Sequence, residues 1–301
     1  MSSRDTTSDR RILVTGGTGQ LATALAGRAD VRRVGRPAFD FDRPETIEAS
    51  FRAAAPRLVV NAAAYTAVDA AERDVAAAWR ANRDGPAILA RLCADAGIPL
   101  IHVSTDYVFD GTKLEPYVET DPVAPQGVYG ASKLAGEQAV LAAGANAIIL
   151  RTAWVYATTG RNFVRTMLTA GKSRDRLTVV ADQHGCPTTA DDLADAILVI
   201  ARRLDRTGWQ PNYHGVFHAA GTGATTWYGL AVATFEDAAS HGTRIPQVAS
   251  IATADWPTPA KRPANSRLDC TRLRDVFDVS LPHWRQSLTR TIDAIYATAP
   301  P

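Results

Sequence analysis

Tyr129 and Lys133 stand four positions apart and could together transfer a proton. A helix brings positions at this spacing onto one face, so the phenol and the ammonium would point into the same cleft. A free tyrosine keeps its proton until about pH 10, and a nearby ammonium favours the phenolate. The pair would therefore make Tyr129 an acid or base that works near neutrality. The same spacing is common on solvated helix faces, so the pattern needs support from elsewhere in the chain.

Two upstream features supply that support. Thr105 comes two residues after an apolar run at 100–103, and a hydroxyl at the end of a buried strand can hydrogen-bond a carbonyl oxygen and support the charge it gains. The alternative is a hydroxyl that only stabilises a turn. A glycine-rich turn at 16–19 follows a first apolar run at 12–14. Turn, hydroxyl, tyrosine and lysine in this order favour a hydride-transfer site, in which a bound nicotinamide would supply the hydride.

The glycine turn has the spacing Gly-x-x-Gly-x-x-Ala, with Gly16, Gly19 and Ala22 at the fixed positions. Glycine permits the tight turn and the close approach of backbone to a pyrophosphate at the start of the next helix. The second strand then ends in Val34-Gly35-Arg36, without the acidic residue that favours NAD. Arg36, or Arg33, could instead bind a 2′-phosphate, which favours NADPH over NADH, unless both arginines are simply solvated.

Further along, Asp40 could accept a hydrogen bond from the adenine amino group while Phe41 covers the ring. The alternative for Asp40 is an ordinary loop carboxylate. Ala62, Ala63 and Ala64 follow the third predicted strand and are small enough for close approach of the nicotinamide half of the cofactor.

Strands and helices alternate along the first half of the chain. This pattern predicts an α/β fold with a doubly wound parallel Rossmann sheet and ligands beyond the carboxyl ends of its strands. The expected strands are 12–14, 31–34, 58–60, 100–103, 147–150 and 177–180, and the expected helices are 20–28, 46–55, 76–96, 132–143 and 191–203. We expect a disordered lead at 1–11, a cofactor domain at 12–150 to which 177–205 returns, and a smaller C-terminal substrate-binding lobe at 151–176 and 206–301.

Composition excludes several classes of function. The chain has 301 residues, of which 46% are hydrophobic and 21% charged, with a net charge of +2. This balance gives no electrostatic case for nucleic acid or an anionic membrane. The polar first eleven residues lack the apolar segment of a signal peptide, and no apolar run is long enough to span a bilayer. Three widely spaced cysteines indicate neither disulfides nor zinc, so we expect a cytoplasmic enzyme.

Longer stretches carry a family resemblance over 12–288. They include Asn61-Ala62-Ala63-Ala64-Tyr65 within 61–72, Ser104-Thr105-Asp106 within 103–111, and Tyr129-Gly130-Ala131-Ser132-Lys133 within 128–137, followed by 151–156, 162–163, 182–188 and 260–268. On these stretches the chain resembles the extended short-chain dehydrogenase/reductases and, within them, the dTDP-4-dehydrorhamnose reductase family. The resemblance implies reduction of the 4-keto group of dTDP-4-dehydro-L-rhamnose to dTDP-L-rhamnose by NADPH, with NADH as the alternative.

The resemblance also implies a role for individual residues. Tyr129 would donate the proton, Lys133 would assist it, and Thr105 would tune the acid. Taken together, the motifs and the resemblance predict that the cofactor contacts Gly16, Gly19, Gln20, Leu21, Arg36, Asp40, Phe41, Ala62, Ala63, Ala64, Tyr65, Tyr129 and Lys133. The resemblance implies that the dTDP-sugar contacts Thr105, Asp106, Trp154 and Arg262. Some family members form a metal-bridged homodimer. The residues around Asp237 do not establish such a site, so no metal ligand is assigned, and Mg²⁺ and the homodimer stay open.

Two alternatives remain at this stage. Another reductase, a dehydratase or an epimerase of sugar nucleotides could share the scaffold, although Asp106 is followed by Tyr107 where dehydratases of the wider family place a second carboxylate. A regulatory subunit of methionine adenosyltransferase also resembles these reductases and acts by binding. The intact Thr105, Tyr129 and Lys133 weigh against that non-catalytic role.

Overall fold

A six-stranded parallel sheet forms the centre of the computed structural model, which describes residues 11–28 and 30–298. Its strands lie in the order β10-β5-β4-β3-β1-β2, and every neighbouring pair is parallel. Their bounds are β1 Ile12–Thr15, β2 Val31–Arg33, β3 Leu58–Asn61, β4 Leu100–Thr105, β5 Ala147–Thr152 and β10 Gly215–His218. The order reverses between β1 and β3, which is where doubly wound folds bind ligands. The predicted disordered lead lies outside the described residues, apart from Arg11.

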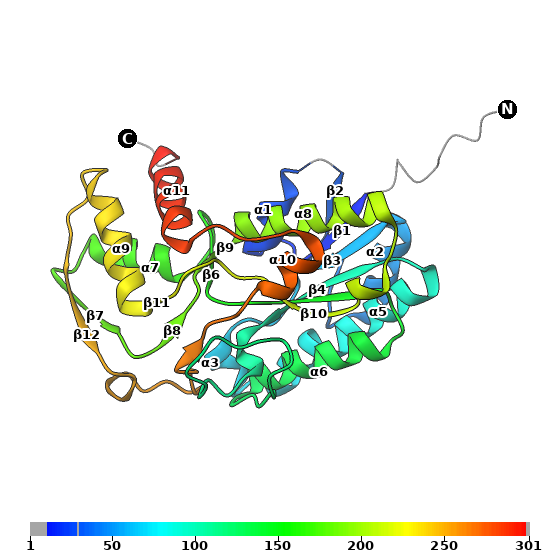
Figure 1. Cartoon of the computed structure of the whole chain (residues 1–301), viewed down its shortest axis with the longest axis horizontal. Helices are drawn as coiled ribbons and strands as arrows, with labels where there is room; N and C mark the ends of the chain where they lie inside the picture. The colour runs from blue at the N-terminus through cyan, green and yellow to red at the C-terminus, as the bar shows by residue number, and fades with distance from the viewer. Residues whose placement is uncertain (1–10, 29, 299–301) are drawn as a thin grey trace.

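Helices cover both faces of this sheet (Figure 1). On one face lie α1 (Gln20–Ala26), α8 (Ala190–Thr207) and α10 (Thr271–Phe277), and on the other α2 (Pro44–Ala54), α5 (Gly85–Ala96) and α6 (Val128–Ala142). Along β1, Ile12 and Val14 pack with α1 and α8, whereas Leu13 faces the opposite layer. The strands are therefore apolar at successive positions because both of their faces are buried.

The long helix expected at 76–96 contains a different local structure. It consists of α4 (Val75–Trp79), a π-helical segment (Arg80–Asp84) and α5. Pro86 cannot donate a backbone hydrogen bond, which weakens the regular α-helical ladder just before it. Within the π-helical segment, the buried Asn82 accepts from the Tyr65 amide and donates to the Tyr65 carbonyl and the Ser132 hydroxyl. The π-helical segment thus places the Asn82 side chain between the loop after β3, which carries Tyr65, and helix α6, which carries Ser132.

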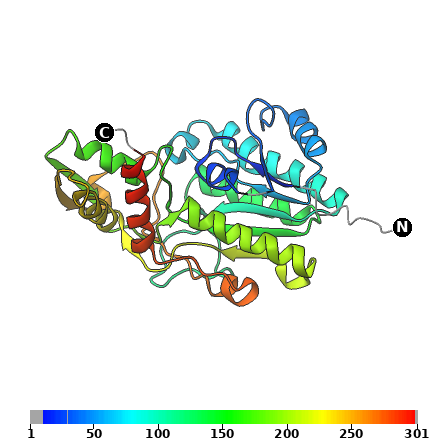
Figure 2. The same ribbon diagram turned by 90° about the horizontal axis from the view of Figure 1, so that it is seen from above.

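The second part of the molecule lies beside the sheet along the long axis (Figure 2). It contains α7 (Phe163–Gly171), α9 (Trp227–Ala239) and α11 (Trp284–Ala297), whose apolar faces share one core cluster. Its strands are β6 (Val155–Tyr156) with β9 (Thr188–Thr189), β7 (Arg176–Val180) with β12 (Gln247–Ile251), and β8 (His184–Gly185) between β11 (Thr225–Thr226) and β13 (Asn265–Ser266).

The sixth predicted strand differs from the expectation. The segment 177–180 does form a strand, β7, but it pairs with β12 outside the main sheet, and β10 takes the sixth place. Exposed and buried positions alternate along most of β7, whereas a strand inside a parallel sheet is buried on both faces. The strand of the segment 177–205 therefore does not join the sheet of the cofactor domain as expected. Helix α8 does pack on α1 against the main sheet. The division into domains otherwise stays a prediction.

Candidate active site

A cavity of about 860 Å³ opens at the carboxyl ends of β1, β3 and β4. Most of the predicted site residues line it. These are Gly16, Gly19, Gln20, Leu21, Arg36, Phe41, Ala62, Ala63, Ala64, Tyr65, Thr105, Asp106, Tyr129, Lys133 and Trp154. Two predicted residues, Asp40 and Arg262, are not in its lining. Trp227 and Arg161, from the second part of the molecule, complete the wall.

The glycine turn brings three backbone segments together. Gly16 and Gly17 have φ values of 111° and 52°, a region that glycine enters without steric cost. A Cβ on Gly16 would lie 3.0 Å from the carbonyl carbon of Ala62, and one on Gly35 would lie 2.3 Å from the Cα of Gly17. The turn after β1 therefore packs against the segments after β2 and β3 so closely that side chains are excluded, which leaves a backbone-lined cradle.

Tyr129 lies in the first turn of α6, and Lys133 follows one turn later on the same side. The Tyr129 ring packs edge-on against Tyr107, with ring centroids 5.4 Å apart. Burial raises the pKa of Tyr129 to about 12, and the nearby Thr105 hydroxyl acts in the opposite direction. The predicted lowering of this pKa by Lys133 is therefore wrong for this structure, because the cost of burying a phenolate is the larger effect.

Lys133 is only 2% exposed. Its ammonium donates to the Val103 carbonyl at 2.7 Å and lies 3.5 Å from Nε2 of His102. Burial lowers the pKa of Lys133 to about 8, while the charge of Glu137 opposes this shift. The Lys133 pKa thus lies well below that of an ordinary lysine.

Thr105 and Asp106 share a hydrogen bond at the end of β4. The Thr105 hydroxyl donates to Oδ1 of Asp106 at 3.1 Å and accepts from the Tyr107 amide. Oδ2 of Asp106 is buried without a protein partner, and burial raises the pKa of this carboxyl to about 6.

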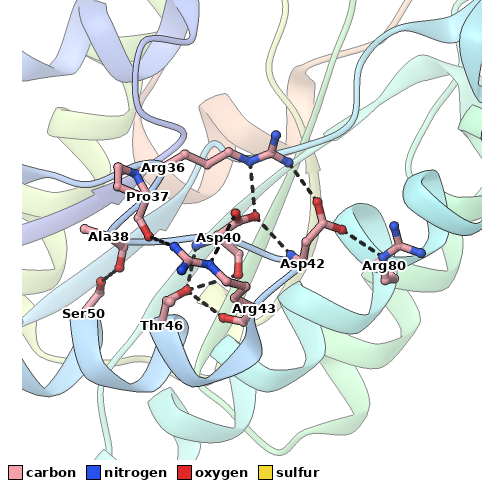
Figure 3. Close-up of polar contacts among 9 residues, drawn as sticks. All are labelled: Arg36, Pro37, Ala38, Asp40, Asp42, Arg43, Thr46, Ser50 and Arg80. Carbon is pink, nitrogen blue, oxygen red and sulfur yellow. Dashed lines mark hydrogen bonds and ion pairs between the residues drawn. The ribbon is translucent and has the colours of Figure 1, made fainter.

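Arg36 lies in a chain of ion pairs at the edge of the cavity (Figure 3). Its guanidinium contacts Asp40 at 3.2 Å and Asp42 at 3.4 Å, and Asp42 also pairs with Arg80 at 2.9 Å. The Asp40 carboxylate is directed to Arg36 and to the Asp42 amide. Phe41 lines the cavity, whereas Asp40 does not, and the predicted contact of Asp40 with adenine stays a prediction.

Arg262 is held away from the cavity by an acidic partner. Its two terminal nitrogens contact the two carboxylate oxygens of Asp69 at 2.8 and 2.7 Å, and the Ala260 amide donates to the same carboxylate. This bidentate pair uses the geometry that would otherwise bind a diphosphate. Arg262 is not among the residues that line the cavity, and its predicted contact with a diphosphate stays a prediction.

Trp154 forms an aromatic wall with Trp227. The indole rings stack with centroids 3.6 Å apart at an angle of 9°, and Nε1 of Trp227 donates to the Gln183 side chain. Trp154 has φ of 49°, and it packs where a Cβ on Gly185 would be 2.3 Å away. An outlying φ in the wall of a cavity suggests that the orientation of this ring matters for function.

The chain matches the family model described as RmlD substrate binding domain over residues 10–297. The chain belongs to this family. A relative from Sinorhizobium fredii named dTDP-4-dehydrorhamnose reductase is 46% identical over 289 residues, which cover 95% of this chain and 97% of the relative.

Two further members show the range of the family. A Streptomyces antibioticus relative, named as a probable dTDP-4,6-dihydroxy-2-methyloxan-3-one 4-ketoreductase, is 41% identical over 297 residues, 97% of each chain. The crystal structure of dTDP-4-dehydrorhamnose reductase from Bacillus anthracis in complex with NADP has a TM-score of 0.85 and 32% identity, covering 95% of this chain and 99% of that one. The predicted family and Rossmann-type fold are thus confirmed.

Sequence reasoning missed several lining or supporting residues. Trp227 was one of several tryptophans in the C-terminal part, and nothing in the pattern distinguished it. Asn61 and His102 are polar residues inside otherwise apolar strands, a signal that could have singled them out.

The described residues contain no group of three or more metal-ligating side chains. Asp237 is bound by Arg285 and Thr289. No described helix is long and apolar enough to cross a membrane.

Proposed function

We propose that this chain reduces the 4-keto group of dTDP-4-dehydro-L-rhamnose to dTDP-L-rhamnose with a reduced nicotinamide dinucleotide. The observation that supports this most strongly is the placement of Thr105, Tyr129 and Lys133 in the wall of one cavity that also contains the glycine cradle. The relatives named dTDP-4-dehydrorhamnose reductase at up to 46% identity support the same substrate.

The glycine cradle fits a dinucleotide. Gly16, Gly17 and Gly35 leave no room for side chains, so a pyrophosphate could approach the backbone there, with Gln20 and Leu21 beside it. Ala62, Ala63 and Ala64 would face the nicotinamide half, and Phe41 the adenine. When bound, the nicotinamide supplies the hydride. The NADP complex of the Bacillus anthracis relative supports this cofactor class.

The chain's own residues would supply the proton. The raised pKa keeps the Tyr129 phenol protonated at neutral pH, which is the state a proton donor needs. As the carbonyl carbon accepts hydride, Tyr129 would give its proton to the carbonyl oxygen, and Thr105 would hold that oxygen in place. Lys133 would bind the nicotinamide ribose and stabilise the tyrosinate that remains. Asp106 and the ring of Trp154 would orient the sugar nucleotide.

We favour NADPH over NADH because Arg36 lines the cavity and its own side chain is 71% exposed, so its guanidinium is accessible to a 2′-phosphate. The exchange this requires is specific: a 2′-phosphate would replace Asp40 or Asp42 as the partner of the Arg36 guanidinium. The homodimer and the cytoplasmic location stay predictions, and no magnesium dependence is assigned.

A related ketoreductase is the alternative that a specific observation favours. The Streptomyces antibioticus relative is named for a different dTDP-ketosugar, so the fold and the catalytic residues alone do not select the sugar. The contacts of Asp106, Trp154 and Trp227 would decide between substrates.

The test is to incubate the purified protein with dTDP-4-dehydro-L-rhamnose and each reduced nicotinamide, following the loss of nicotinamide absorbance and the product by mass. Oxidation of one cofactor per dTDP-L-rhamnose formed supports the proposal. Turnover without net oxidation would indicate an epimerase, and failure to reduce this sugar while another dTDP-ketosugar is reduced would indicate the related ketoreductase. Capture of a synthetase partner without any reduction would indicate the regulatory role.

A further inference from the structure

A buried histidine lies directly behind Lys133 and has no part in the proposed chemistry. His102, on β4, is fully buried. Its Nδ1 lies 2.9 Å from Nδ2 of Asn61, and its Nε2 lies 3.5 Å from the Lys133 ammonium nitrogen. The imidazole therefore connects the end of β3 to the lysine that faces the cavity.

The contacts of Asn61 fix the orientation of its amide. Its Oδ1 lies 2.6 Å from the Thr15 hydroxyl and 3.3 Å from the Ala63 amide nitrogen, both of which donate to it. A separation of 2.6 Å suits an O–H···O bond and is short for an N–H···O bond. The reversed amide would also set its NH₂ against the Ala63 N–H. Oδ1 therefore faces Thr15, and the NH₂ group faces His102.

This orientation selects the tautomer of the histidine. Because the Asn61 NH₂ donates, Nδ1 of His102 has to accept, and a neutral imidazole then carries its proton on Nε2. Burial and the neighbouring Lys133 charge keep the pKa of His102 well below its usual value, so the ring is neutral. The Nε2–H group consequently points at the Lys133 nitrogen.

An N–H group directed at an amine favours its neutral form. The lone pair of a neutral Lys133 can accept from Nε2–H while the amine still donates to Val103, whereas an ammonium would face the positive end of that N–H bond. The donors form a series that ends at Lys133: the Ala63 amide donates to the Thr15 hydroxyl, this hydroxyl donates to Asn61, and the Asn61 amide donates to His102. The lowered pKa of this lysine agrees with that direction.

Other charges around α6 act differently. Glu137, one turn further along the helix, favours the ammonium, but it is paired with the buried Arg151 of β5 and the Ser104 hydroxyl. The other titratable groups on the elements packed against α6 have partners of their own or lie away from Lys133. Asp69 pairs with Arg262, Glu72 accepts from the Val128 amide, Asp106 accepts from Thr105, and Tyr107 packs on Tyr129. Cys93 lies in the core of the sheet, and the partly or fully exposed groups are Arg80, Arg83, Asp84, Arg91 and Asp95. His102 is thus the group that approaches Lys133 from behind.

We propose that His102 is a positioning residue for the reaction: fixed as the Nε2–H tautomer by Asn61, it directs this N–H at the Lys133 amine and so sets the pH at which that amine loses its charge. The role assigned to Lys133 rests on the proposed function, whereas the tautomer and the titration of Lys133 do not. Above the pH at which Lys133 becomes neutral, the reaction should slow, since the ammonium no longer supports the tyrosinate.

The first test reads the histidine directly, without substrate. Nitrogen-15 NMR of histidine-labelled protein should show His102 as a neutral ring with Nδ1 unprotonated and Nε2 protonated. A carbon-13 titration of the lysine side chains should show Lys133 losing its proton near pH 8. A protonated Nδ1, an imidazolium, or a Lys133 that titrates like an exposed lysine would overturn the proposal. These readouts decide it even if the protein reduces a different sugar.

The second test uses a matched pair of variants. His102→Leu removes the N–H donor, and His102→Gln places an amide N–H where Nε2–H had been. In kcat/KM measured against pH, the alkaline limb of His102→Leu should move upward by on the order of one pH unit, and His102→Gln should restore it. A purely structural role for His102 would lower the plateau of both variants and leave the limb where it is, which would refute the proposal.

Discussion

Replacing Tyr129 by phenylalanine removes one oxygen atom from the wall of the cavity and leaves the ring. The edge-on contact with Tyr107 remains, and the position in the first turn of α6 is unchanged. The phenolic oxygen lies near the Thr105 hydroxyl, and losing one such polar interaction costs about 1 kcal/mol of stability. We therefore expect Tyr129→Phe to fold and to bind NADPH with nearly unchanged affinity.

The effect on rate should be far larger. General acid catalysis contributes about 10²- to 10⁴-fold, which corresponds to about 2.7–5.5 kcal/mol of transition-state stabilisation. Cofactor binding is measured by fluorescence titration and the chemical step by single-turnover oxidation of NADPH with the ketosugar. Tyr107→Phe is the matched control, because it removes the same atom from the adjacent ring, and its loss should be much smaller. Wild-type turnover by Tyr129→Phe, or equal losses in the two variants, would refute the assignment of the proton donor.

Three further predictions concern the remaining parts of the cavity. Arg36→Ala should raise the KM for NADPH more than that for NADH, and Asp42→Asn should lower the KM for NADPH, since it removes a competing partner of the guanidinium; equal effects on both cofactors would remove the argument for the 2′-phosphate. Trp227→Ala should raise the KM for the sugar nucleotide about two- to tenfold, because an aromatic stack contributes about 0.5–1.5 kcal/mol, and an unchanged KM would show that the Trp154 wall does not need its partner. Burial raises the Asp106 pKa from 3.8 to about 6, so the folded protein binds this proton more tightly than the unfolded chain and loses stability as pH rises between these values. Asp106→Asn should therefore increase the free energy of unfolding at pH 7 by at most about 3 kcal/mol, with little change near pH 4. Urea unfolding of the two proteins at both pH values measures this, and an equal change at pH 4 and pH 7 would contradict it.

Local sequence patterns were sufficient to predict the first five strands of the main sheet and the segments after β1, β3 and β4 that line the cavity. Apolar runs bounded by glycine or proline marked β1, β3 and β4, and the residues after each of them lie together because the strands are parallel. Short-range spacing likewise placed Tyr129 and Lys133 on one face of α6.

What the sequence could not indicate depends on contacts between distant residues. The pairing of β7 with β12 joins segments about seventy residues apart, and no local pattern reports such a partner. The same holds for the ion pair between Arg262 and Asp69, which joins residues far apart in the sequence. The Tyr129 pKa was misjudged for a related reason, since the sequence shows the neighbouring lysine but not the depth of burial.

The π-helical turn at Arg80–Asp84 has a consequence for how this chain can vary in length. A π-helical turn holds one residue more than an α-helical turn while the flanking turns keep their register, so deleting one residue here would let α4 continue into α5 as regular α-helix and would remove the local widening that carries Asn82. Asn82 would swing out of its place between Tyr65 and Ser132, and the loop that carries Tyr65 into the cavity would lose its anchor. Insertions and deletions that are harmless in the surface helices should therefore be excluded from these five positions.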